Sequence, residues 1–320
     1  MGNKPNMKKI LITGGAGYIG NVLCRNFLKT GNYKVTVLDS FLFQQQNSLL
    51  DLISNDNFNI IKGDVRNFNL FKKLISEHDI VIPLAAIVGA PACEQDKLLS
   101  TEINLDQIIN LKKCLSKNQL VILPITNSGY GVGSDDMFFD EKSPLNPISH
   151  YGKLKVEAEK IMLDFENFIS LRLATVFGIS NRMRIDLLVN DFVYRATKDK
   201  YLLLFESHFK RNFIHIEDIA SVMIFFIENF GNYKNNIFNV GLEDANLSKK
   251  DLCELIKKQI SDFIYVENSF KKDPDQRNYI VSNKKLLATG WRPKKSVNIG
   301  IKELIKCYDY FEVNNNKNFV

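Results

Sequence analysis

The 320-residue sequence predicts an α/β fold: a doubly wound parallel sheet followed by a smaller mixed α/β domain at the C-terminal end. Two observations support this prediction. Short runs of Ile, Val and Leu recur through the first half without polar alternation, as in strands buried on both faces of a parallel sheet. Stretches with helical spacing separate these runs, and strand–helix alternation is typical of a doubly wound sheet.

The expected elements follow the chain in order. Strands are expected in the first half over Lys9–Thr13, Lys34–Leu38, Phe58–Ile61, Ile80–Leu84, Leu120–Ile125 and Phe168–Leu173. Helical spacing separates them over Ile19–Lys29, Leu70–Glu77 and Ile103–Leu115. In the less regular second half we expect helices over Arg182–Thr197, Ile216–Asn229 and Lys249–Ile260, and strands over Tyr201–Phe205 and Ile237–Val240. We therefore predict a Rossmann domain over residues 1–178, to which 212–240 return, and a second domain over 179–320.

Composition narrows the class of protein. The net charge of +6 comes from scattered lysines without a continuous basic run, which indicates a solvated surface rather than a nucleic-acid site. A mild positive field also suits an anionic substrate. The five cysteines show no Cys-x-x-Cys spacing, which favours reduced thiols over a zinc site or disulfides. No apolar run approaches the roughly 18 residues of a membrane span. We expect a cytoplasmic protein with no metal, membrane or nucleic-acid partner.

A glycine-rich loop follows the first expected strand and precedes a helix. In this context Gly14 would permit a tight turn, Gly17 would let a pyrophosphate approach the backbone, and Gly20 would let the helix pack close to the sheet. The helix N-terminus then offers unpaired N–H groups to phosphates. The loop predicts a dinucleotide site.

The end of the second expected strand indicates which dinucleotide binds. Asp39 lies 19 residues after Gly20, where a carboxylate accepts both hydroxyls of an adenine ribose. It would repel a 2′-phosphate, and Ser40–Phe43 supplies no Arg or Lys to offset this. NAD is therefore favoured over NADP. Further residues near the strand ends are expected at the cofactor: Tyr18, Ile19, Asp64, Val65, Leu84, Ala85 and Ala86.

A tyrosine and a lysine four residues apart suggest hydride chemistry. Tyr151 and Lys155 would share one face of a helix. A phenol with a pKa near 10 is a poor base at neutral pH. An ammonium about 5 Å away, at an effective dielectric of about 20, favours the phenolate by roughly 3 kcal/mol. Tyr151 could then deprotonate a hydroxyl while hydride leaves the same carbon, with Thr126 sharing the proton and Lys155 also holding the nicotinamide ribose.

These motifs resemble those of the extended short-chain dehydrogenase/reductases, in the branch of nucleotide-sugar epimerases and dehydratases. The resemblance covers nearly the whole chain. It rests on Thr13–Gly20, Asp64-Val65, Leu84–Ala86, Asn104, Thr126, Tyr130-Gly131, Tyr151 with Lys155, Leu171–Gly178 and Arg211–Asp218.

The resemblance implies an NAD-dependent enzyme, and a homo-oligomer, whose second domain binds the nucleotide sugar. It implies that Asn190, Arg211 and Arg277 are candidates for the substrate diphosphate. Asn127, Ser128 and Thr175 are the further substrate-binding candidates.

One departure from the family pattern bears on the reaction. Family dehydratases carry an acidic pair after the threonine, where this chain has Asn127-Ser128. Without those carboxyls a 4,6-elimination lacks its proton shuttle, and a C3/C5 epimerase lacks a second acid/base. Cys93, in the run Val88–Cys93, is a further candidate to approach the sugar, although a small buried thiol is the more frequent explanation for such a residue.

A narrower resemblance concerns the run Thr126–Gly131 together with Arg182–Arg184 and Asp186–Phe192. It is similar to the GDP-D-glycero-α-D-manno-heptose 4-dehydrogenases of bacterial capsule synthesis. That likeness implies oxidation of the C4 hydroxyl to a ketone by a tightly bound NAD, which 2-oxoglutarate re-oxidises. A C4 epimerase shares the first half-reaction and is the alternative. A non-catalytic NAD-binding protein is disfavoured by the intact Tyr–Lys pair.

Overall fold

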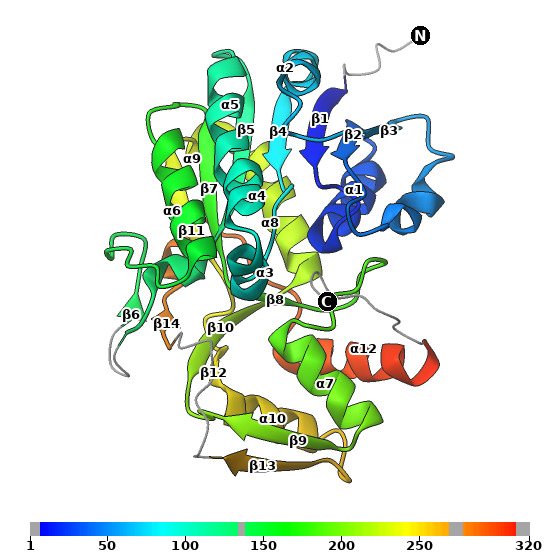
Figure 1. Ribbon diagram of the computed structural model, residues 1–320, viewed down its shortest axis with the longest axis vertical. Coiled ribbons are helices and arrows are strands. Elements are labelled where there is room, and N and C mark those ends of the chain that lie inside the picture. The colour runs from blue at the N-terminus through cyan, green and yellow to red at the C-terminus, as the bar shows by residue number, and fades with distance from the viewer. Residues whose placement is uncertain (1–6, 134–137, 269–277, 312–320) are drawn as a thin grey trace.

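The computed structural model describes residues 7–133, 138–268 and 278–311 (Figure 1). A seven-stranded parallel sheet has the order β3-β2-β1-β4-β5-β7-β11. Its strands are β1 (Lys8–Thr13), β2 (Tyr33–Asp39), β3 (Phe58–Lys62), β4 (Ile80–Pro83), β5 (Leu120–Thr126), β7 (Phe168–Leu173) and β11 (Asn236–Val240). The strand order reverses between β1 and β4, and ligands bind at such a switch point. The predicted fold class is confirmed.

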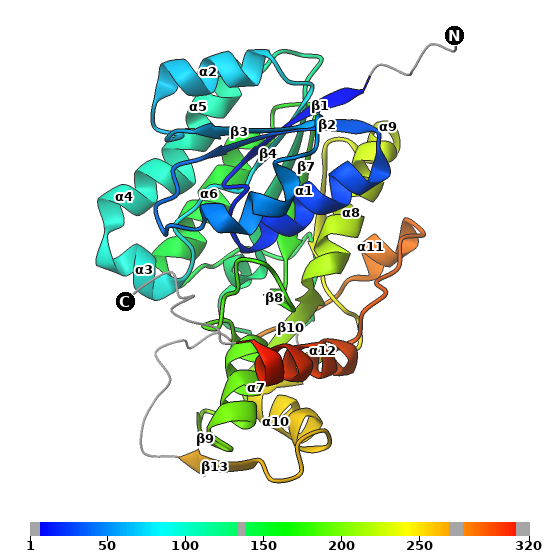
Figure 2. The same cartoon turned by 90° about the vertical axis from the view of Figure 1, so that its right-hand side faces the viewer.

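Helices cover both faces of this sheet (Figure 2). On one face α1 (Tyr18–Thr30) packs against α8 (Ile216–Glu228), and α9 (Phe230–Tyr233) follows. The other face carries α2 (Phe68–Ser76), α3 (Ala90–Gln95), α4 (Lys97–Thr101), α5 (Gln107–Cys114) and α6 (His150–Met162). A π-helical turn, η2 (Glu102–Asp106), lies between α4 and α5.

Successive strand residues enter separate cores on the two faces of the sheet. In β1, Ile10 and Ile12 belong to the core beneath α1 and α8, whereas Leu11 belongs to the core beneath α2 and α5. All three are fully buried. A strand with both faces buried has no polar side, which explains why the sequence shows continuous apolar runs.

The smaller part lies beyond the carboxyl ends of the large sheet (Figures 1 and 2). Its strands are β8 (Thr175–Phe177), β10 (Lys210–His215) and β12 (Asn246–Ser248) in one sheet, and β9 (Tyr201–Phe205) with β13 (Ile264–Asn268) in another. Its helices are α7 (Leu188–Lys198), α10 (Lys249–Lys257) and α12 (Val297–Tyr310). The remaining elements are β6 (Phe138–Phe139), β14 (Ile280–Val281), α11 (Lys284–Ala288) and the 3-10 turns η1 (Gln46–Leu52) and η3 (Asn127–Tyr130).

The helix expected from Arg182 is wrong at its start, because α7 begins only at Leu188. Side chains hold the preceding segment in an irregular loop. The Arg184 guanidinium donates to both oxygens of Asp186, at 2.7 and 2.5 Å, and the Arg182 N–H donates to Ser180 Oγ at 3.3 Å. These local bonds compete with helix formation.

The chain crosses more than once between the large sheet and the smaller part. Part of 212–240 lies in the large sheet as β11, while β10 pairs with β8 and β12. The division at residue 178 stays a prediction. Within the described ranges, no helix is both long and apolar enough to cross a membrane.

Candidate active site

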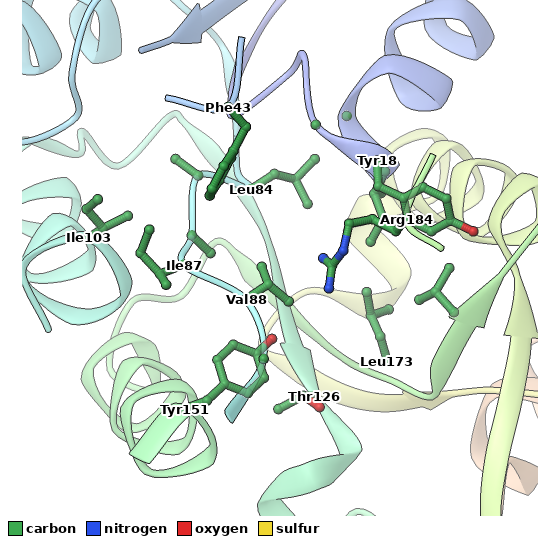
Figure 3. Close-up of a pocket in the computed structure, with 18 of the residues that line it drawn as sticks. Tyr18, Phe43, Leu84, Ile87, Val88, Ile103, Thr126, Tyr151, Leu173 and Arg184 are labelled. Carbon is green, nitrogen blue, oxygen red and sulfur yellow. The ribbon is translucent and has the colours of Figure 1, made fainter. Parts of the chain in front are cut away.

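A deep pocket lies where the large sheet meets the smaller part (Figure 3). It opens at the carboxyl ends of β1, β2, β3, β4 and β5. All but one of the residues predicted to bind the cofactor lie in its lining: Gly14, Gly17, Tyr18, Ile19, Asp39, Asp64, Val65, Leu84, Ala85 and Ala86. The exception is Lys155, which does not line the pocket, so its contact with the nicotinamide ribose stays a prediction. The switch-point geometry explains this, because neighbouring parallel strands end at one edge of the sheet.

The glycine loop has no room for side chains at Gly14, Gly15 and Gly20; a Cβ on Gly15 would lie 2.5 Å from Val37 Cγ2. Gly14 has a φ of 70°, and a Cβ there would lie 2.7 Å from the Ala85 backbone N. A Cβ on Gly20 would lie 2.6 Å from the Gly14 carbonyl oxygen. At Gly17 a Cβ would meet only the Gly14 oxygen, at 3.1 Å, so this backbone faces open space. The loop is thus a cradle in which a pyrophosphate can reach the N-terminus of α1.

Asp39 is held at the end of β2 by backbone donors. Its Oδ2 accepts the Ala16 N–H at 2.9 Å, and its Oδ1 accepts the Phe41 N–H at 2.8 Å. Burial raises the pKa of this carboxyl, and the two N–H donors oppose the rise. The carboxylate is therefore oriented before any ribose arrives, which suits its predicted role.

Tyr18 ties the glycine loop to the smaller part. Its hydroxyl donates to the Gly178 carbonyl at 2.7 Å and accepts from Asn190 Nδ2 at 3.2 Å. The phenol is buried, and burial raises its pKa. Tyr18 consequently fixes the first turn of α1 against the chain that follows β8.

The proposed proton-transfer residues lie at the other end of the pocket. Ser149 caps α6 by accepting the Gly152 N–H at 3.1 Å, which starts the helix just before Tyr151. Figure 3 shows Tyr151 and Thr126 together at this end. The Thr126 hydroxyl donates to Ser128 Oγ at 2.9 Å and accepts the Ser128 N–H at 3.1 Å.

The two residues after Thr126 have different positions. Ser128 lines the pocket, whereas Asn127 does not. Asn127 is fully buried, and neither polar atom of its side chain finds a hydrogen-bond partner within the described part of the chain. Of the two, only Ser128 is placed to meet a substrate directly.

Lys155 lies behind the pocket wall. Its side chain is buried, and burial lowers its pKa to about 8. The thiol of Cys93 lies near enough for its charge state to affect Lys155. That thiol donates to the Ile87 carbonyl at 3.2 Å, and burial raises its pKa to about 11. Cys93 is thus a neutral buried thiol that does not line the pocket. This agrees with the second of the two alternatives given for Cys93 from the sequence, a small buried thiol.

The residues nominated for the substrate are only partly brought together. Thr175 lines the pocket. Asn190 and Arg211 do not line it, and both are buried. The Asn190 side chain accepts the Gly178 N–H at 3.1 Å and donates to the Arg184 carbonyl at 3.0 Å, so it holds these two segments. Arg277 lies outside the described residues.

Two arginines that sequence reasoning did not assign to the site line the pocket instead. Arg182 and Arg184 are both buried, and Figure 3 shows the Arg184 guanidinium directed into the space between Tyr18 and Leu173. The run Arg182-Met183-Arg184 was the sequence feature from which these two pocket residues could have been predicted. The sequence predicts a helix over this run, whereas it forms a loop, and the loop places both arginine side chains at the pocket.

The fold and this site define an NAD-dependent enzyme of the nucleotide-sugar epimerase/dehydratase class. The sequence pattern of the NAD-dependent epimerase/dehydratase family matches residues 10–241, and the chain belongs to that family. NAD is accordingly its cofactor, and the glycine cradle and Asp39 fit that molecule.

Relatives of known activity cover nearly the whole chain. CDP-paratose 2-epimerase of Salmonella typhi is 26% identical and covers 94% of this chain and 98% of its own length. UDP-glucose 4-epimerase of Lactobacillus helveticus is 26% identical, with 89% and 92% covered. UDP-glucuronic acid 4-epimerase of Bacillus cereus, solved with UDP-glucuronic acid and NAD, is 26% identical with a TM-score of 0.82, covering 94% and 99%.

Proposed function

We propose that this protein is an NAD-dependent nucleotide-sugar 4-epimerase, which oxidises the C4 hydroxyl to a ketone and reduces it again on the opposite face. The observation that carries the proposal is the set of side chains at one end of the NAD pocket. Tyr151 and Thr126 face it, and Asn127-Ser128 stand where dehydratases carry carboxyls. The 4-epimerases among the relatives support the same reading.

The proton chemistry follows from α6 and the end of β5. NAD, when bound, supplies the acceptor for the hydride from C4. Tyr151, as phenolate, takes the proton of the C4 hydroxyl while the C4–H bond breaks. A protonated Lys155 one helical turn later favours the phenolate electrostatically. In the return step the hydride would go back to the opposite face of C4 while Tyr151 gives the proton back to the ketone oxygen, so atoms and electrons balance over the cycle.

The substrate side of the pocket suits a polar, anionic ligand. Arg182 brings a positive charge into the lining, and Arg184, which is paired with Asp186, brings further N–H donors. Thr175 and Ser128 offer hydroxyls to a sugar. Arg184 is held in place by its two hydrogen bonds to Asp186, and a side chain that is already oriented is better suited to position a ligand. Direct diphosphate contacts from Asn190, Arg211 and Arg277 remain predictions.

A second candidate is the 4-dehydrogenase of GDP-D-glycero-α-D-manno-heptose. The observation in its favour is that Arg182 and Arg184, from the run that resembles those enzymes, line the pocket. Here the ketone would leave, and a 2-oxo acid such as 2-oxoglutarate would re-oxidise the cofactor. The two functions share every step up to the ketone.

Product analysis tests both candidates. The purified protein would be incubated with UDP-glucose, UDP-glucuronic acid or GDP-heptose, with and without 2-oxoglutarate, and products followed by NMR. Inverted C4 identifies the epimerase. A ketone that accumulates with 2-oxoglutarate identifies the dehydrogenase. A failure to convert any nucleotide sugar contradicts the proposal.

Tyr151→Phe is the matched control, since it removes only the hydroxyl. We expect at least about a 100-fold loss of turnover, which is typical of losing a general acid/base. NAD content should stay at the wild-type level. Full activity in this variant would move the proton transfer to another residue.

A further inference from the structure

The turn after β2, residues Phe41–Gln45, has an unusual and well-fixed backbone conformation, and it has no role in the proposed sugar chemistry. Phe41 and Gln44 have φ values of 56° and 52°, a left-handed conformation that residues with side chains rarely adopt. Such conformations persist where surrounding contacts impose them, and they cluster at ligand sites. This turn contributes Leu42, Phe43 and Gln45 to the pocket lining.

Hydrogen bonds attach the turn to the ribose carboxylate. Asp39 Oδ1 accepts the Phe41 N–H at 2.8 Å and Gln45 Nε2 at 3.2 Å. Gln45 Oε1 in turn accepts the Phe43 N–H at 2.9 Å, and the Gln44 N–H closes the turn on the Phe41 carbonyl at 2.9 Å. The Gln45 amide therefore spans from Asp39 to the backbone of Phe43.

The next segment anchors the turn to the glycine loop. The Ser48 hydroxyl donates to the Ala16 carbonyl at 2.8 Å, and Arg25 of α1 donates to the Ser48 carbonyl at 2.7 Å. The turn is thus fixed on one side by Asp39 and on the other by the loop that receives the pyrophosphate. The position of Phe43 is thus set by Asp39 and the glycine loop, the two features that we expect to bind the cofactor.

Phe43 projects into the adenosine end of the pocket. Figure 3 shows its ring beside Leu84, at the end away from Tyr151. Because β2 and β3 are neighbours, the turn lies next to Asp64 and Val65, which also line the pocket. The ring is only half-buried, and Leu42 beside it is 54% exposed, so apolar surface is presented at the pocket.

We propose that Phe43 is a cofactor-binding residue whose ring stacks on the adenine of NAD, with Gln45 as a positioning residue that holds the turn to Asp39. The carboxylate that takes the ribose hydroxyls lies four residues before the ring, and the adenine is joined to that same ribose. Aromatic side chains stack on nucleobases through their π-faces. The turn thereby slows release of NAD. This inference rests on NAD binding and not on the proposed sugar chemistry.

The rate of NAD release tests the proposal. Protein purified with its NAD would be chased with excess ADP, and released NAD measured over time. Phe43→Ala should release NAD at least about tenfold faster, in line with the loss of one base–aromatic stack. Phe43→Tyr keeps the ring and should stay within about twofold of wild type, and Phe43→Leu should fall between.

Controls separate the ring from general disruption. Phe68→Ala, the same change on an exposed residue of α2 outside the pocket lining, should leave release unchanged. Thermal unfolding verifies that each variant is folded. If Phe43→Ala does not fold, the release rate of Phe43→Leu is used in its place. Release within twofold of wild type in both Phe43→Ala and Phe43→Leu overturns the proposal.

Two further measurements place the contact. The affinity for ADP should fall with Phe43→Ala, while that for UDP or GDP should not; the reverse pattern would assign the ring to the substrate and overturn the proposal. If Gln45 acts through Phe43, Gln45→Ala should speed release in the wild type and add little in the Phe43→Ala background. Additive effects would exclude a positioning role for Gln45.

Discussion

At the scale of single residues, Lys155 shows a conflict between stability and chemistry. Its amino group is buried in α6, with 7% of the residue exposed, and burial lowers its pKa to about 8 from an ordinary 10.5. Burying a charge destabilises the folded state. A buried amine with a lowered pKa beside a pocket indicates a functional role, which agrees with the expected partnership with Tyr151.

Lys155→Met should therefore stabilise the NAD-free protein while abolishing turnover. Between pH 8 and 10.5 the unfolded chain holds the lysine proton more tightly, so wild-type stability rises with pH across this window. The gain from Met should be largest below pH 8, up to about 3 kcal/mol, and should shrink toward pH 10.5. Urea unfolding at pH 7 and 9.5 measures it. A variant less stable than wild type at pH 7 would refute the burial argument.

At the scale of elements, a buried polar network joins α6 to the sheet. Glu159, two turns beyond Tyr151, lies 2.6 Å from Arg172 Nη2 of β7 and accepts the Ser170 hydroxyl at 2.6 Å. Arg172 Nη1 donates to the Tyr130 hydroxyl of η3 at 2.9 Å. The helix that carries Tyr151 and the turn that follows Thr126 are thus held to one strand.

Removing one member of this network should destabilise the protein strongly. Glu159→Leu leaves the buried Arg172 charge without its carboxylate, and we expect a loss of about 3–5 kcal/mol in the free energy of unfolding. The double variant with Arg172→Met removes both charges and should recover most of that loss. A double-mutant cycle by urea unfolding measures the coupling. Simple additivity of the two losses would show that the pair does not act as a unit.

At the scale of the whole molecule, the site depends on contacts between the large sheet and the smaller part. The Tyr18 hydroxyl bonds to Gly178 and Asn190, and the Tyr308 hydroxyl of α12 donates to the Asn190 carbonyl at 3.2 Å. Helices α7 and α12 also pack against each other. The glycine loop is therefore positioned by residues far away in the sequence.

Tyr18→Phe should weaken this connection without changing the loop sequence. The Gly178 carbonyl loses its Tyr18 donor, and a buried polar group left unpaired costs about 1–3 kcal/mol. We expect that decrease in the free energy of unfolding, together with faster NAD release. Tyr310→Phe, on a residue that is 78% exposed, is the matched control. Equal stability of the two variants would contradict the assigned role.

Local sequence pattern and residue spacing were sufficient to predict much of the fold and of the pocket. The β7 strand over Phe168–Leu173 has the predicted bounds, and Gly14, Asp39, Thr126 and Tyr151 meet in one pocket. These features are predictable because buried parallel strands are continuously apolar and because their carboxyl ends converge at one edge. The sequence by itself thus determined the fold class, the cofactor NAD and most of the residues that gather in one pocket.

Only the tertiary structure decided which polar residues line the pocket. Arg182 and Arg184 line the pocket, whereas Asn190 is occupied in holding Gly178 and Arg184. The Phe43 ring points into the pocket because Asp39 and Gln45 hold its turn. The physical reason is common to all of these. In an irregular loop the direction of a side chain is set by partners distant in sequence, and neither periodicity nor spacing reports them.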